Sequence, residues 1–247
     1  MVKAHKTISK VSRENLVECA RSLIPVLREE ADAAERRRAI APEIITSLRE
    51  AGIFRILQPE RFGGFEYDFG MVVRINSLIG QGCTSTAWVC GLGITHQWII
   101  SGFPPQAQQD VWSENSEAIT YGSYGPVAEA KPVDGGWTIS GSWPFASGCD
   151  HGQWGLLGAQ FGDAHANDAS APGFILVPAA DYRIHDDWFT NGLAATGSKS
   201  IVCEDVFVPS HRRLMFSDVM SGNSPGYRAS GKPLYSIPMF AGIPTAI

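Results

Sequence analysis

The sequence predicts an α+β protein in which a helical N-terminal region precedes a small β-domain. Apolar residues repeat at helical spacing as far as residue 112, whereas short β-branched and aromatic runs alternate with turn residues beyond residue 117. A final apolar run over residues 239–247 resembles the opening of another helix. We therefore expect a helical domain over 1–116, a β-domain over 117–213, and a connector with the start of a further helical domain over 214–247.

The helical region begins with an apolar stripe from Leu16 to Leu27 that follows a Ser12 cap, and Pro25 is expected to kink or divide this helix. A second stripe, residues 44–51, has Pro42 in its first turn and Gly52 at its end. Residues 56–64 contain a proline and a Gly-Gly pair and are expected to form a loop. Further helices are expected over residues 71–79, 84–100 and 105–112.

Trp88 and His96 lie eight residues apart within one of these helices. At 3.6 residues per turn, this spacing puts both side chains on nearly the same face. Two interpretations stay open: the pair lines a cavity, or Trp88 belongs to the core and His96 is a partly buried histidine with its hydrogen bonds satisfied.

The β-domain is predicted from short runs separated by turn residues, which is the pattern of a small antiparallel barrel or sandwich. Residues 162–172 form a polar, small-residue stretch that is expected to be a loop. The expected strands cover residues 118–121, 129–133, 137–140, 154–160, 173–177 and 201–208.

The composition is that of an ordinary globular protein: 247 residues, 44% hydrophobic, 18% charged, with a net charge of −5. This charge gives no electrostatic reason to expect nucleic acid or an anionic membrane as a partner. Five scattered cysteines argue against a disulfide framework, and the six histidines have no metal-ligand spacing. No apolar run reaches the length of a membrane span, so we expect a cytoplasmic protein without a metal.

The stretch 134–150 is the strongest candidate for a binding site. An Asp-Gly turn opens a strand that runs into an aromatic, glycine-rich corner carrying one hydroxyl, Ser147. Trp137, Trp143 and Phe145 offer apolar walls, and Ser147 offers a hydrogen bond without a charge, which suits a flat ligand. The alternative is an ordinary hairpin whose aromatic residues are core.

Three motifs resemble those of the acyl-CoA dehydrogenase superfamily. Residues 57–64 read Leu-Gln-Pro-Glu-Arg-Phe-Gly-Gly, residues 192–198 read Gly-Leu-Ala-Ala-Thr-Gly-Ser, and residues 206–209 read Val-Phe-Val-Pro. The resemblance implies helical and β-domains in the predicted order. The C-terminal four-helix domain of that superfamily is expected to be absent or only begun in this chain.

Within the superfamily, the chain resembles the two-component monooxygenases that use reduced flavin, such as those that hydroxylate 4-hydroxyphenylacetate. Residues 143–148, Trp-Pro-Phe-Ala-Ser-Gly, have the form typical of these enzymes. Residues 120–126 lack the acidic and Gly-Ser-Asp elements that dehydrogenases usually carry there. The resemblance implies FMNH2 or FADH2, O2, a C4a-hydroperoxyflavin, and hydroxylation of an aromatic or polycyclic substrate.

The resemblance also implies roles for single residues. Ser147 would face the flavin N5, Ser123 would lie near the C4a edge, and Trp88 would pack against the substrate. His96, whose ordinary pKa is near neutrality, would accept a phenolic proton or bind the phenolate. The implied cofactor-binding residues are Ser123, Trp143, Phe145, Ala146, Ser147, Gly148, Thr196 and Ser198.

The implied partners are a separate flavin reductase and further copies of the chain in a tetramer. Two other functions stay open at this level. One is an acyl-CoA dehydrogenase-like enzyme that holds FAD and oxidises an acyl thioester, and the other is a non-catalytic interaction module.

Overall fold

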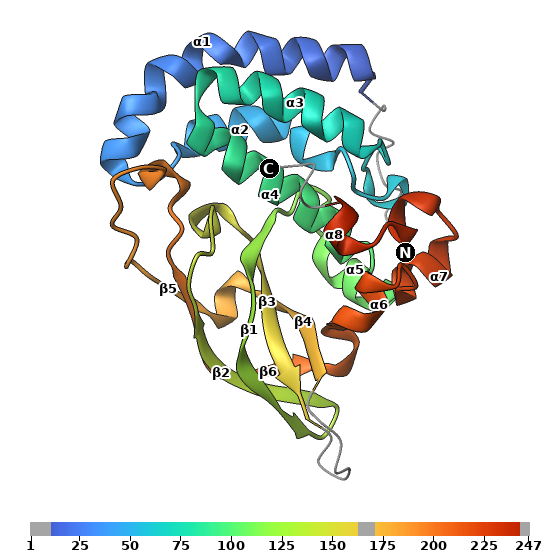
Figure 1. Cartoon of the computed structure of the whole chain (residues 1–247). Helices are drawn as coiled ribbons and strands as arrows, with labels where there is room; N and C mark the ends of the chain where they lie inside the picture. Colours follow the sequence, from blue (N-terminus) through green and yellow to red (C-terminus); the bar gives the residue numbers. More distant parts are fainter. Residues whose placement is uncertain (1–10, 163–170, 243–247) are drawn as a thin grey trace.

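The computed structural model describes residues 11–162 and 171–242, so residues 163–170 of the expected polar loop and 243–247 of the expected terminal run lie outside it. A layer of helices covers one end of a curved β-sheet (Figure 1). The predicted α+β class is therefore confirmed.

The helical layer confirms the expected elements. Ser12 caps the first helix by accepting a hydrogen bond from the amide of Asn15, and the helix continues through Pro25 without a break. Pro42 occupies the first turn of the second helix, and Gly52 follows that helix with a φ of +79°. The helices are α1 Arg13–Arg37, α2 Pro42–Glu50, α3 Phe69–Gly82, α4 Thr84–Ile100 and α5 Pro105–Trp112.

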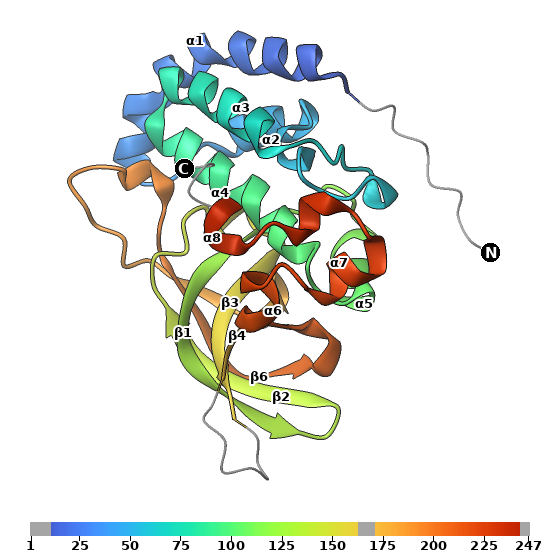
Figure 2. The ribbon, with the colours of Figure 1, turned by 45° about the vertical axis from the view of Figure 1, so that its right-hand side comes forward.

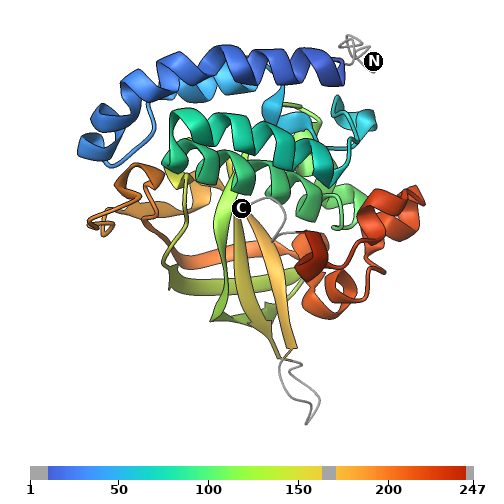
Figure 3. The ribbon, with the colours of Figure 1, turned by 45° about the horizontal axis from the view of Figure 1, so that its top comes forward.

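Helix α4 joins the helical layer to the β-domain. It packs against α3 on one side, and on the other it contacts β1 Thr120–Val133 and the short 3₁₀ helix Ala194–Thr196 (Figure 3). Its residues are buried almost throughout, in keeping with a sequence that is apolar on all faces. A side chain on α4 that reaches a cavity is therefore held by a rigid, buried element.

The strands form one seven-stranded sheet in the order β5-β6-β2-β1-β3-β4-β7. Neighbouring strands are antiparallel except β1 and β3, which run parallel, so the sheet is mixed rather than purely antiparallel. Two of the expected strands are parts of one strand, β1, whose register shifts between Ser123 and Ala128. The remaining strands are β2 Gly136–Trp143, β3 Trp154–Phe161, β4 Ala171–Pro178, β5 Arg183–His185, β6 Ser200–Pro209 and β7 Arg213–Met215.

The segment after β7 lies beside α4, α5 and strand β4 (Figure 2). Two hydrogen bonds attach it to the helical layer: the Trp98 indole donates to the carbonyl of Leu234, and the Tyr235 hydroxyl donates to the carbonyl of Leu57. Its short helices are α6 Phe216–Met220, α7 Pro225–Ser230, the 3₁₀ helix Pro233–Ser236 and α8 Met239–Gly242.

Candidate functional site

A cavity of about 430 Å³ lies between α4, the first residues of β1 and the two loops that follow β2 and β5. This volume is within the range of small-molecule sites, and the lining is mostly apolar with a few hydroxyl groups and one imidazole. Four separate parts of the chain contribute to it. The lining residues are Trp88, Leu92, His96, Gly122, Ser123, Tyr124, Phe145, Ser147, Trp188, Leu193, Thr196 and Ser198.

One wall of the cavity comes from α4. Trp88, Leu92 and His96 follow one another at four-residue spacing and therefore share a face of the helix. Of the two interpretations of Trp88 and His96, the structure supports the one in which both line a cavity.

His96 is 1% exposed, and its Nδ1 lies 2.9 Å from the carbonyl oxygen of Thr120. A carbonyl only accepts hydrogen bonds, so Nδ1 carries the proton and Nε2 is left with a free lone pair. Nε2 is buried and has no hydrogen-bond partner within the described residues. Burial lowers the pKa of His96 to about 4, against the opposing effect of the Thr120 carbonyl. In the folded chain the pKa of His96 therefore lies well below its ordinary near-neutral value, because the ring is buried.

The second wall comes from β1, where it departs from regular pairing with β3. Gly122, Ser123 and Tyr124 line the cavity just before and at the register shift. The Tyr124 ring centroid lies 5.4 Å from that of His96. Bulges re-aim side chains near functional sites, and this one brings Tyr124 beside the histidine.

The corner between β2 and β3 supplies Phe145 and Ser147. Phe145 adopts a φ of +62°, which is uncommon for a bulky residue, and its side chain is 67% exposed at the rim. Its ring stands edge-on to Trp188 with centroids 6.0 Å apart. Gly148 has a φ of +77°, and a Cβ there would lie 2.7 Å from the Tyr121 ring, so only glycine fits. These constraints fix Ser147, which is 4% exposed, against the cavity.

Hydrogen bonds connect Ser147 to α4 and to the segment that precedes β6. The Trp88 indole donates to Ser147 Oγ at 3.0 Å, and Ser147 Oγ lies 2.7 Å from Ser198 Oγ. Ser198 Oγ in turn lies 2.6 Å from Thr196 Oγ1, which donates to the carbonyl of Leu193 at 2.8 Å. Three of the four hydroxyl groups expected from the sequence, all but that of Ser123, thus form one connected chain.

Glu35, near the end of α1, supports this arrangement from the helical layer. Its carboxylate accepts hydrogen bonds from the backbone amides of Ala194 and Ala195 and from the Ser85 hydroxyl. It therefore holds the start of the segment that carries Thr196 and Ser198. The sequence interpretation missed Glu35, although a carboxylate in the last turns of a helix, where the dipole disfavours it, was an available signal.

The structure brings most of the predicted site residues together, but three of them lie outside the cavity lining. Trp143 is fully buried in the core of the sheet, where its indole donates to the carbonyl of Gly158 at 2.7 Å. Ala146 is buried, and Gly148 contributes its backbone amide to the carbonyl of Thr196. The lining residues that the sequence interpretation did not identify are Leu92, Gly122, Tyr124, Trp188 and Leu193.

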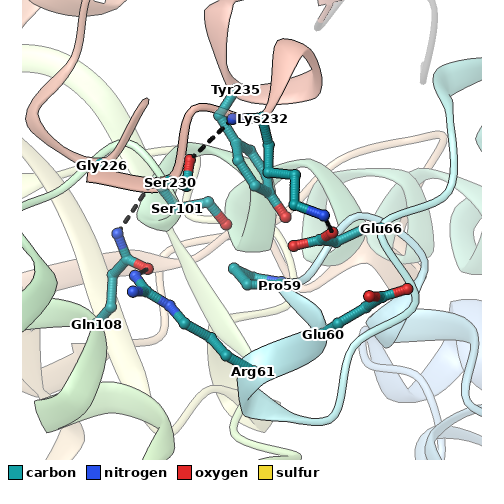
Figure 4. Close-up of a pocket in the computed structure, with 10 residues that line it drawn as sticks. All are labelled: Pro59, Glu60, Arg61, Glu66, Ser101, Gln108, Gly226, Ser230, Lys232 and Tyr235. Carbon is teal, nitrogen blue, oxygen red and sulfur yellow. Dashed lines mark hydrogen bonds and ion pairs between the residues drawn. The ribbon is translucent and has the colours of Figure 1, made fainter. Parts of the chain in front are cut away.

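A second cavity, of about 280 Å³, lies between the helical layer and the segment after β7 (Figure 4). Its charged groups find partners at its edges: Lys232 pairs with Glu66 at 3.0 Å, and Arg61 donates to the side chain of Gln108 at 2.6 Å. None of its described lining side chains has a buried polar atom without a hydrogen-bond partner. The first cavity, with the free Nε2 of His96, is therefore the better candidate site.

Within residues 11–162 and 171–242, no three His, Cys, Asp or Glu side chains gather as metal ligands would. In the same part of the chain, no helix combines the length and the apolar character needed to cross a membrane.

Comparison with known families finds a match in the helical part of the chain. Residues 12–115 match the acyl-CoA dehydrogenase N-terminal domain. Residues 12–115 therefore correspond to this domain, in agreement with the resemblance found in the fold and motifs.

The relatives that match most of the chain are flavin-dependent oxygenase components. The chain is 43% identical, over 90% of its length, to the oxygenase component of the FADH2-dependent resorcinol hydroxylase of Rhizobium sp. (strain MTP-10005), of which it covers 54%. It is 39% identical, over 92% of its length, to the oxygenase subunit HsaA of a flavin-dependent monooxygenase of Rhodococcus jostii (strain RHA1), of which it covers 59%. The chain is homologous to the oxygenase components of two-component flavin-dependent monooxygenases.

A solved structure agrees with this result. The HsaA monooxygenase from M. tuberculosis matches 96% of this chain with a TM-score of 0.90 and 31% identity, and the chain covers 64% of that protein. The chain thus spans between about half and two thirds of the lengths of the relatives it matches.

Proposed function

We propose that the cavity between α4 and the β-domain binds reduced flavin beside a phenolic substrate, and that the protein hydroxylates this substrate with O2. The observation that carries the proposal is that His96, whose buried Nε2 has no hydrogen-bond partner among the described residues, and Ser147 line one largely apolar cavity. Homology to flavin-dependent oxygenase components supports it. Reduced flavin, when bound, supplies the electrons that activate O2.

The residues present fit such a flat ring system. Aromatic side chains form apolar walls, and polar groups are few and fixed in position. We assign Ser147 to the flavin N5 and Ser123 to the neighbouring edge of the ring. Thr196 and Ser198 hold the Ser147 hydroxyl from behind.

Apolar side chains surround the opening of the cavity, and we assign them the exclusion of water once ligands are bound. Phe145 and Trp188 stand edge-on to each other there, and Leu193 lies beside them. Exclusion of water protects reactive species and strengthens the remaining polar interactions in the site.

His96 positions the substrate hydroxyl. Because its Nδ1–H donates to Thr120 and its depressed pKa keeps the ring neutral near pH 7, Nε2 only accepts a hydrogen bond. This geometry favours a neutral phenol, which donates its O–H, over a phenolate, which needs a donor. The hydrogen bond draws the phenolic proton toward Nε2 and raises the electron density of the aromatic ring. Trp88, whose indole N–H is directed to Ser147, also lines the cavity, and we assign it to packing against the substrate.

The substrate class follows from this assignment. A phenol with an open ring position next to the hydroxyl-bearing carbon satisfies His96, and resorcinol, named for one relative, has this chemistry. The same relative supports FADH2 as the cofactor and a separate reductase as its source. We also propose the division expected from the sequence, with a helical domain over 1–116, a β-domain over 117–213 and a connector from residue 214.

A stopped-flow experiment tests the proposed function. Reduced FMN and, separately, reduced FAD are bound without oxygen, and the complex is mixed with oxygenated buffer while flavin absorbance is followed. We expect a transient absorbance before the oxidised spectrum, and hydroxylated product when resorcinol is present. Reoxidation at the rate of free flavin contradicts the proposal, and bleaching of bound oxidised FAD by an acyl-CoA supports a dehydrogenase instead.

Two variants separate the roles of the residues. Ser147→Ala should shorten the transient, whereas His96→Gln should leave the transient and abolish most product formation. Ser140→Ala removes an exposed hydroxyl on β2, away from the cavity lining, and serves as the control. An unchanged transient in Ser147→Ala, or full product in His96→Gln, means that the assigned role is wrong.

A further inference from the structure

The hydrogen bonds around Ser147 have only one complete assignment of their hydrogens. The chain begins at the Trp88 indole, which only donates, and ends at the Leu193 carbonyl, which only accepts. Between them stand three hydroxyl groups, those of Ser147, Ser198 and Thr196, and each brings one hydrogen.

The direction is fixed from the carbonyl end. Thr196 must donate to the Leu193 carbonyl, at 2.8 Å, because that oxygen carries no hydrogen. Ser198 must then donate to Thr196 Oγ1, at 2.6 Å, and Ser147 must donate to Ser198 Oγ, at 2.7 Å. Any reversal leaves two oxygens in close contact without a hydrogen between them, which costs free energy in a buried site.

The consequence falls on Ser147. Its hydrogen is used on Ser198, and one of its lone pairs accepts the Trp88 indole N–H. One lone pair remains, so toward the cavity the Ser147 hydroxyl only accepts hydrogen bonds. Ser198 and Thr196 are 5% and 2% exposed, which shields this direction from exchange with solvent.

We propose that the chain of hydroxyl groups from Thr196 through Ser198 makes Ser147 an acceptor and thereby gives the site its preference for reduced over oxidised flavin. The inference rests on the proposed function. Reduced flavin carries a hydrogen on N5 and donates it to Ser147, whereas the N5 of oxidised flavin carries a lone pair and meets another lone pair. Ser198 and Thr196 are positioning residues that act through Ser147.

The preference for reduced flavin also changes the reduction potential of the bound flavin. Tighter binding of the reduced form raises the two-electron potential of the bound flavin above that of free flavin. One neutral hydrogen bond corresponds to a preference of about tenfold. Loss of a tenfold preference lowers the potential of the bound flavin by about 30 mV.

The test uses two substitutions that open the chain of hydroxyl groups and one that keeps it. Ser198→Ala removes the acceptor of the Ser147 hydrogen, and Thr196→Val removes the anchoring hydroxyl with little change of shape. Thr196→Ser retains the hydroxyl and is the conservative partner of Thr196→Val. If one of the opening variants fails to fold, the other still tests the proposal.

The first readout needs no flavin. The seven tryptophans give seven indole N–H peaks in a proton–nitrogen NMR spectrum, and Trp88→Phe identifies the peak of Trp88. We expect this peak to move in Ser198→Ala and Thr196→Val and to stay in Thr196→Ser. A Trp88 peak that stays in both opening variants overturns the assignment of the hydrogens.

The second readout is the ratio of the dissociation constants of oxidised and reduced flavin, measured without oxygen for FMN and for FAD. We expect Ser198→Ala and Thr196→Val to lower this ratio about tenfold and Thr196→Ser to retain it. If the chain binds flavin but all variants keep the ratio, the inference fails and the proposed function stands. If the unsubstituted chain binds neither flavin in either redox state, both fail.

Discussion

The buried neutral state of His96 predicts a specific dependence of stability on pH. Its pKa is about 4 in the folded protein and 6.5 when unperturbed, so between these values the unfolded chain binds more protons than the folded one. The free energy of unfolding therefore gains a contribution that is fully present above pH 6.5 and is lost as the pH falls toward 4.

The magnitude follows from the same two values. Each unit of pKa difference corresponds to about 1.4 kcal/mol, so the complete loss is about 3 kcal/mol. Between pH 7 and pH 5, where carboxylates stay largely ionised, the loss is about 2 kcal/mol. His151 also has a pKa lowered by burial. Its contribution to the pH dependence is the same in the unsubstituted protein and in a His96 variant, so it cancels when the two are compared.

The assay is urea denaturation of the unsubstituted protein and of His96→Gln at several pH values from 7 to 5. Glutamine keeps an amide donor for the Thr120 carbonyl and does not titrate. We expect the difference in unfolding free energy between the two proteins to fall by about 2 kcal/mol over this range. A difference that is constant with pH would show that His96 is solvated or already charged in the folded protein, and the argument for a neutral acceptor would be refuted.

Two further predictions concern the frame of the site. Gly148→Ala should destabilise the protein by about 1–3 kcal/mol, because the new Cβ meets the Tyr121 ring at a residue with a positive φ. Gly192→Ala is the control and should change stability little, because a Cβ there meets nothing within 4 Å. Equal denaturation midpoints for the two variants would contradict this prediction. Glu35→Gln should lower the free energy of unfolding by about 2 kcal/mol and speed amide hydrogen exchange at Ala194. The reason is that the single amide oxygen of glutamine replaces a carboxylate that accepts three hydrogen bonds. Unchanged exchange at that amide would show that Glu35 does not hold the segment.

Much of the fold was predictable because the relevant signals are local. The helical spacing of apolar residues and the Ser12 cap are contained within a few turns, and they placed α4 and α5 at their observed boundaries. The pairing of β1 with β3, in contrast, could not be predicted from local signals. Its parallel direction depends on a connection through β2 and the corner that follows, which no local pattern encodes.

The site was predictable to the extent that its residues stand in short motifs or share a helix face. Ser147, Thr196 and Ser198 stand in glycine-rich motifs, and His96 lies eight residues from Trp88. Tyr124 was missed because the register shift that turns it toward His96 arises from tertiary pairing. Trp143 was assigned to the flavin wall because a tryptophan at a strand end fits a wall and a core equally well, and burial decides between them.

The cavity is assembled from four segments that are far apart in sequence, on α4, on β1, at the corner after β2, and between β5 and β6. No one of these segments forms a site by itself, so the cavity exists only in the folded chain and a ligand that occupies it binds the folded state alone. A ligand at one hundred times its dissociation constant then stabilises the folded chain by about 2.7 kcal/mol. For a protein of this size that corresponds to a rise in melting temperature of about 5–10 °C. Thermal shift therefore offers a direct way to rank phenols and flavins as ligands before any turnover is measured.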